Sequence, residues 1–191
     1  MRASVFHSLE TPRLQIRHFT PADLPTLLAY RNDPLVARYQ SWESMTEAEG
    51  RAFIEEMQQR QPGEPGPGFQ FAIALKTSGL HIGDCYFKIL DYDPHQAEIG
   101  YSLARAHWGQ GFATEALTAI LEYSFRTLDL HRIIAIADCE NRASIALLER
   151  LGMRREGHFL KSMWSKGAWG DEYQYAILLE EWRSRHRSTP Q

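Results

Sequence analysis

Hydrophobic and polar residues along the chain follow two periods, which separate strands from helices. Residues 13–17 alternate polar and apolar positions, as a half-buried strand does, and mostly apolar runs follow at 69–75, 80–90 and 96–103. Between Ala113 and Leu128, apolar residues recur at helical spacing. We therefore expect one early strand, three consecutive strands in the middle of the chain, and a long helix after them.

The residues that begin helices predict two of them between the first and second strands. Thr20 followed by Pro21 and Asp23 offers an N-cap, a proline at the first helical position and an acid at the third. Thr46 and Glu49 form a capping box for the second helix. The sequence Asn32-Asp33-Pro34 ends the first helix, and the Gly/Pro-rich segment 61–68, which we interpret as a surface loop, ends the second.

The last third of the chain returns to strands around one short helix. Residues 131–137 are nearly all apolar, as in a strand buried on both faces, and two more strands are expected near 155–164 and 171–179. Asn141 opens the short helix and Gly152 closes it. A helix between 96–103 and 131–137 requires a right-handed crossover, and hence a parallel pair. The fold class predicted is α+β: a mixed, mostly antiparallel sheet with helices on its faces.

Composition limits the class of protein. A chain of 191 residues fits a single domain, 1–191, and its net charge of -3 gives no field that would hold nucleic acid or a membrane. Cys85 and Cys139 stand alone in apolar runs, as free thiols do in a reducing compartment. No signal peptide, membrane-spanning run or metal-binding spacing is visible. We expect a cytoplasmic protein with no metal.

A glycine turn joins the strand 96–103 to the long helix. Gly109 and Gly111 would let the backbone approach an anion, and the N–H groups of the helix start would favour its charge. Alone the pair is a weak signal, because a tight turn also uses glycines. A P-loop would need Lys followed by Ser or Thr where Phe112 and Ala113 stand, and a third glycine for a dinucleotide fold is missing.

The turn resembles the acetyl-CoA signature of GNAT acetyltransferases, Arg/Gln-x-x-Gly-x-Gly/Ala. Gly111 and Ala113 match it, whereas Trp108 departs from the Arg/Gln position in the way usual for the branch similar to ribosomal-protein N-acetyltransferases (RimJ/RimL-type). Segments 9–17, 32–34, 141–144, 151–153 and 167–177 also resemble that branch. The resemblance covers about residues 9–183, in the right order.

The resemblance implies an acetyl-CoA-dependent N-acetyltransferase that moves an acetyl group directly to an amine. The pantetheine arm would lie where the strand 96–103 splays from 131–137, and the pyrophosphate would lie on the N–H groups of the glycine turn. The residues expected to bind acetyl-CoA are Tyr101, Ser102, Leu103, Trp108, Gly109, Gln110, Gly111, Phe112, Ala113, Thr114 and Asn141. Asn141 is equally well explained as a plain helix N-cap.

Two residues are expected to be catalytic. Glu98 lies in an apolar strand, where burial would raise its pKa toward that of a useful base; its alternative is a structural carboxylate. Many family members use a tyrosine as acid where this chain has Leu148, so Ser144, a serine used in the ribosomal-protein branch, is the expected acid. Its alternative is an ordinary polar residue in the first helical turn.

The acceptor is left open by the sequence. Aromatic and basic residues expected to line its groove are Tyr30, Arg31, Tyr39, Trp42, Tyr86 and Trp164. A protein N-terminal α-amine is the first choice by resemblance, and a small amine such as an amino acid, polyamine or aminoglycoside is the alternative. A non-catalytic acyl-CoA-binding module is a third interpretation. An open edge strand near the C-terminus could pair two copies into a homodimer.

Overall fold

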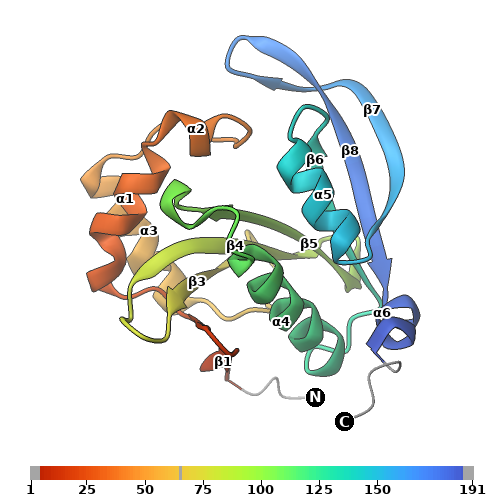
Figure 1. Cartoon of the computed structure of the whole chain (residues 1–191), viewed down its shortest axis with the longest axis horizontal. Coiled ribbons are helices and arrows are strands. Elements are labelled where there is room, and N and C mark those ends of the chain that lie inside the picture. The colour runs from red at the N-terminus through yellow and green to blue at the C-terminus, as the bar shows by residue number, and fades with distance from the viewer. Residues whose placement is uncertain (1–4, 65, 187–191) are drawn as a thin grey trace.

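The computed structural model describes residues 5–64 and 66–186, and Figure 1 shows the path of the chain. Residue 65 of the expected loop 61–68 and the two ends of the expected domain 1–191 therefore lie outside the described residues. The elements in chain order are β1 (Ser8–Glu10), β2 (Leu14–Arg17), η1 (Pro21–Asp23), α1 (Leu24–Arg31), α2 (Pro34–Ala37), α3 (Glu47–Gln59), β3 (Phe69–Leu75), β4 (His81–Leu90), β5 (Asp93–Leu103), η2 (Arg105–His107), α4 (Phe112–Arg126), β6 (Arg132–Asp138), α5 (Arg142–Arg150), β7 (Arg154–Ser165), β8 (Ala168–Leu178) and α6 (Leu179–His186).

The strands form one eight-stranded sheet in the order β1-β2-β3-β4-β5-β6-β8-β7. Neighbouring strands are antiparallel except β5 and β6, which are parallel and joined through α4. The expected mixed α+β fold with one parallel pair is thus confirmed.

The parallel pair is short, and this shapes the site. β5 and β6 are in register only from Gln96 opposite Arg132 to Ile99 opposite Ala135. Beyond that point β5 continues beside β4 to Leu103, while β6 continues beside β8 to Asp138. The two strands therefore separate over their C-terminal parts, which opens a gap in the middle of the sheet.

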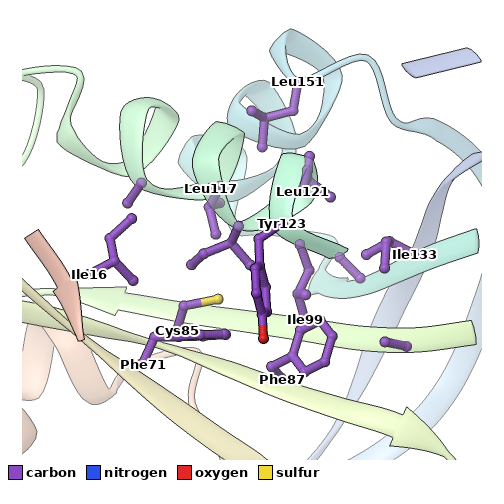
Figure 2. Close-up of a cluster of buried hydrophobic side chains, with 14 of the residues drawn as sticks. Ile16, Phe71, Cys85, Phe87, Ile99, Leu117, Leu121, Tyr123, Ile133 and Leu151 are labelled. Atoms are coloured by element: carbon purple, nitrogen blue, oxygen red, sulfur yellow. The ribbon is translucent and has the colours of Figure 1, made fainter. Parts of the chain in front are cut away.

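Alternating side chains place apolar clusters on opposite faces of the sheet. Phe71 packs with α4 and α5 in the larger cluster, which Figure 2 shows, whereas the next residue, Ala72, packs with α1 and α3. Beyond the gap, the face of the sheet that carries Ala72 is covered less, since Ile136 of β6 is 41% exposed there. That uncovered face lies beside the gap between β5 and β6.

Some elements differ from the expectation. Asp33 caps a short helix, α2, directly after the expected break: its side chain accepts a hydrogen bond from Leu35 N. α6 follows β8 without a break, and β5 begins at Asp93, three residues before the expected start of that strand at residue 96. Pro62 is buried, so the segment after α3 is not purely a surface loop. Within residues 5–64 and 66–186, no helix has the length and apolar character needed to cross a membrane.

Candidate active site

A row of free backbone donors lies at the N-terminus of α4. Gly109 and Gly111 have φ of 71° and 80°, a left-handed backbone that glycine adopts without strain. Among the described residues, nothing accepts a hydrogen bond from the N–H groups of residues 109–114. These donors, at the positive end of a helix of 15 residues, make the anion cradle that the sequence indicated.

Two side chains, one from the turn itself and one from just before β2, hold this cradle in place. The Trp108 indole donates to the Leu103 carbonyl at 2.7 Å, which ties the turn to the end of β5. Arg13 Nε donates to Glu115 Oε2 at 2.6 Å, and Arg13 Nη1 donates to the Gln110 carbonyl at 3.0 Å. Trp108 thus has a structural partner of its own where most family members carry Arg or Gln. The link from Arg13 was not predicted from the sequence.

At the gap between β5 and β6, two hydroxyl groups meet. The Tyr101 hydroxyl and Ser144 Oγ form a hydrogen bond of 2.7 Å, which joins β5 to the first turn of α5. Asn141 Oδ1 accepts from Ser144 N at 3.1 Å, so Asn141 does cap α5. Burial raises the pKa of Tyr101 well above its ordinary value, partly offset by the Ser144 hydrogen bond. The phenol therefore keeps its proton at any physiological pH.

A cleft of about 1150 Å³ extends from this gap onto the uncovered face of the sheet. Glu98, Gly100 and Ser102 face it from β5, and Tyr101, Asn141 and Ser144 line its other side. Among the described residues no side chain hydrogen-bonds to the Glu98 carboxylate. Burial raises the pKa of Glu98, Lys88 lowers it in part, and Glu172 raises it further. The structure therefore brings both expected catalytic residues into one cleft.

Four of the six expected acceptor residues line this cleft: Arg31, Tyr39, Trp42 and Tyr86. Tyr30 does not, because it is buried in the core and donates its hydroxyl hydrogen to Asp84. Trp164 does not either; it is 57% exposed and packs edge to face against Trp169, which is the hairpin tryptophan that lines the cleft.

Residues 38–42, just after α2, line one wall of the cleft. Gln40 Nε2 donates to the Tyr101 carbonyl at 3.3 Å, and the Tyr39 hydroxyl donates to the Glu140 carbonyl at 3.4 Å. Lys166, at the tip of the β7–β8 hairpin, donates to the Ala37 carbonyl, and Figure 1 shows this tip bending toward α2. No pattern in the sequence predicts this bridge, since its partners are far apart along the chain.

Comparisons with known proteins agree with this geometry. Residues 13–154 match the family model described as an acetyltransferase (GNAT) domain. The chain is 36% identical over 174 residues to the uncharacterized N-acetyltransferase YnaD of Bacillus subtilis, covering 91% of this chain and 98% of that protein. A solved GNAT-family acetyltransferase from Bacillus anthracis is 34% identical, with a TM-score of 0.80 over 91% of this chain and 99% of that one.

The resemblance to ribosomal-protein acetyltransferases is confirmed over part of the chain. The [ribosomal protein uS5]-alanine N-acetyltransferase of Escherichia coli is 36% identical over 88 residues, which cover 46% of this chain and 45% of that enzyme. The family match spans the cradle, the gap and both catalytic candidates. The chain belongs to the GNAT acetyltransferase family and is an acetyl-CoA-dependent N-acetyltransferase.

Proposed function

We infer that the chain transfers the acetyl group directly to an amine bound in the cleft, with Glu98 as base and the Tyr101–Ser144 pair as acid. The observation that carries this inference is their placement: the carboxylate and the hydroxyl pair line one cleft that opens from the gap between β5 and β6. A base and an acid are needed on either side of the reacting carbon, and this cleft supplies both.

The described residues fit acetyl-CoA in two respects. The free N–H groups of residues 109–114 suit a pyrophosphate, and the gap beside Tyr101, Ser102 and Leu103 leaves backbone for the pantetheine arm. Bound there, acetyl-CoA supplies an activated thioester carbonyl. Gln40 donates to the Tyr101 carbonyl, at the edge of the gap, so its side chain lies next to the pantetheine position.

Glu98 is suited to remove the amine proton. The reaction joins the amine nitrogen to the acetyl carbon and breaks the bond from that carbon to sulfur. Starting from the protonated amine, two protons leave nitrogen: sulfur gains one, and the other passes to solvent. A primary amine is mostly protonated at neutral pH, so a base must accept its proton. The Glu98 carboxylate, free of hydrogen-bond partners among the described residues and with a raised pKa, is available for this.

The sulfur can receive its proton from the hydroxyl pair. Ser144 is the acid expected from the sequence, and the structure adds Tyr101, whose phenol shares a hydrogen bond with it. Ser144 gives its hydroxyl proton to sulfur and takes the phenol proton of Tyr101 in return, and the phenolate at once regains a proton from solvent, so the two act as one donor unit. Burial raises the pKa of both Cys85 and Cys139, which disfavours a thiolate and hence a covalent acetyl-cysteine route.

For the acceptor, we infer a protein N-terminal α-amine, with a small amine as the alternative. The E. coli relative acts on an alanine of a ribosomal protein, and the amine that an alanine can offer in a protein is an N-terminal one. This supports the first choice over the shared 88 residues. The cleft wall carries Glu98, Asp138 and Glu172, which favour a cationic amine in either case.

The test is release of free CoA from acetyl-CoA in the presence of amines. A panel of N-terminal peptides and of small amines is incubated with the protein, and products are identified by mass spectrometry. Acetylated peptide supports the first choice, and acetylation of small amines alone supports the alternative. Absence of any amine-dependent CoA release across the panel would refute direct transfer by Glu98 and the hydroxyl pair.

A further inference from the structure

Among the described residues, two buried N–H groups of side chains that line the cleft have no acceptor. The Nε of Arg31 and the Nε1 of Trp42 are both shielded from solvent, and among the described residues neither finds a hydrogen-bond partner. The Arg31 guanidinium lies over the Trp42 ring, with its central carbon 3.7 Å from the ring centroid. Because buried donors are normally paired, two orphans side by side indicate a place for a ligand oxygen.

The charge around Arg31 shows what kind of oxygen this is. Arg31 Nη2 donates to Asp84 Oδ2 at 2.8 Å, and the side chains of this ion pair are only 5% and 3% exposed. Gln70 Oε1 accepts from the same nitrogen at 3.0 Å. The guanidinium charge is thus already balanced, so a second carboxylate at this place would be buried without a counter-ion. A neutral carbonyl or hydroxyl oxygen avoids that penalty.

The strand register relates this place to the reacting centre. Asp84 lies opposite Ser102 of β5. Glu98 is four residues before Ser102 on the same face of β5, which is about 13 Å along the strand. Gly100, where β5 and β6 begin to separate, is midway between them. An amine held near Gly100 would leave an oxygen a few bonds away within reach of the long Arg31 side chain.

We propose that Arg31 Nε and Trp42 Nε1 form a subsite for a neutral oxygen of the acceptor, close to its amine. The acceptor class is then an amine bearing an amide, ester or hydroxyl oxygen, and neither a plain alkylamine nor a free amino acid. This inference rests on the amine-transfer function proposed above. It makes Arg31 and Trp42 determinants of specificity, while Glu98 and the hydroxyl pair perform the chemistry.

Three matched amines test it: L-alaninamide with a neutral carbonyl, L-alanine with a carboxylate, and isopropylamine with neither. Values of kcat/KM are corrected for the fraction of neutral amine, because the three differ in pKa. The corrected kcat/KM for alaninamide is expected to exceed that of each other amine by about 10- to 100-fold, the usual effect of one or two hydrogen bonds to buried donors.

Trp42→Phe removes one donor and keeps the stacking ring. It is expected to lower kcat/KM for alaninamide about 10-fold more than that for isopropylamine, and thermal unfolding of the variant checks that it is folded. Arg31→Lys, which keeps the charge but removes Nε, should act in the same direction. Trp164→Phe, at an exposed tryptophan outside the cleft, is the matched control and should change neither value.

The outcomes separate the subsite from the function. Equal corrected kcat/KM for all three amines, or an equal loss for alaninamide and isopropylamine in Trp42→Phe, would overturn the subsite and leave the transfer function standing. Alanine equal to or better than alaninamide would overturn the neutral-oxygen assignment. No acetylated product from any amine would refute the proposed function and the subsite with it.

Discussion

The Tyr101 hydroxyl lies 2.7 Å from Ser144 Oγ, so β5 and α5 present a shared hydroxyl pair to the cleft. If the pair acts as one acid, removing either member should lower kcat by about 100-fold. Tyr101→Phe and Ser144→Ala remove only the hydroxyl groups, and steady-state kinetics with one acceptor gives the comparison.

The double variant makes this prediction specific. Tyr101→Phe with Ser144→Ala should be no slower than the slower single variant, because groups that act as a unit are not additive. Two independent losses that multiply would show separate roles. Full activity of Ser144→Ala with loss only in Tyr101→Phe would leave the tyrosine as sole acid.

The pH dependence of turnover should follow Glu98. Its pKa is raised by burial, and the base is active only when ionised, so kcat should rise with pH through this raised pKa. Glu172 raises the pKa of Glu98 further through its like charge, and Glu172→Gln should therefore shift the acidic limb to lower pH. Profiles of kcat at saturating acceptor, wild type against variant, measure the shift. If the acidic limb of the profile did not move, the titration behind it would belong to a group other than Glu98.

The same carboxylate should reduce stability at neutral pH. A carboxyl whose folded pKa is raised stabilises the fold fully below its unfolded pKa and loses that contribution as pH rises through the folded pKa. Glu98→Gln removes the ionisation. Its Tm should exceed that of the wild type at pH 7 and match it near pH 4, as measured by thermal unfolding. A lower Tm at pH 7 would indicate a structural role for Glu98.

Most of the fold could be predicted because its signals are local. The capping box of Thr46 and Glu49 forms as expected at the start of α3, and β3 has the expected bounds, Phe69–Leu75. The glycine turn likewise has the left-handed backbone that its residue types require. In each case the residues that decide the structure lie within one turn or one strand, so the sequence pattern contains the information.

The acid pair and the acceptor residues depend on contacts between distant segments. Tyr101 and Ser144 are 43 positions apart and meet only because β5 and α5 pack across the gap. Trp164 and Trp169 are cross-strand partners whose rings meet edge to face, with centroids 5.3 Å apart, yet only Trp169 lines the cleft. Residue types alone do not determine either arrangement.

The left-handed glycines allow a controlled test of the anion cradle. Gly109 and Gly79 have φ of 71° and 69°, and a Cβ at either would meet no atom within 4 Å. Alanine at each position should therefore lower the free energy of unfolding by about 1–2 kcal/mol through backbone strain alone.

Only Gly109→Ala should also weaken acetyl-CoA binding, by about 10-fold, because relief of strain turns the cradle N–H groups away. Denaturant unfolding measures the stability and calorimetric titration the affinity; equal affinity in the two variants would contradict the cradle.

The contact between Glu115 and Arg13 gives a test of how the cradle is positioned. Glu115 accepts hydrogen bonds from Thr11 Oγ1 at 2.6 Å and from the Arg13 backbone at 2.8 Å, and Arg13 in turn holds the Gln110 carbonyl. Although burial raises it, these partners hold the pKa of Glu115 below its ordinary value, so the carboxylate is ionised at neutral pH.

Glu115→Gln removes the charge that orients Arg13 and should raise KM for acetyl-CoA about 10-fold, the scale of one charged hydrogen bond, while KM for the acceptor stays unchanged. Glu47→Gln is the control: Glu47 pairs with Arg51 on the exposed face of α3, and such surface pairs contribute little. If Glu115→Gln raised KM for both substrates alike, the residue would support the fold in general. A rise in KM confined to acetyl-CoA places the effect of Glu115 at the cradle, because Arg13 holds the turn through the Gln110 carbonyl.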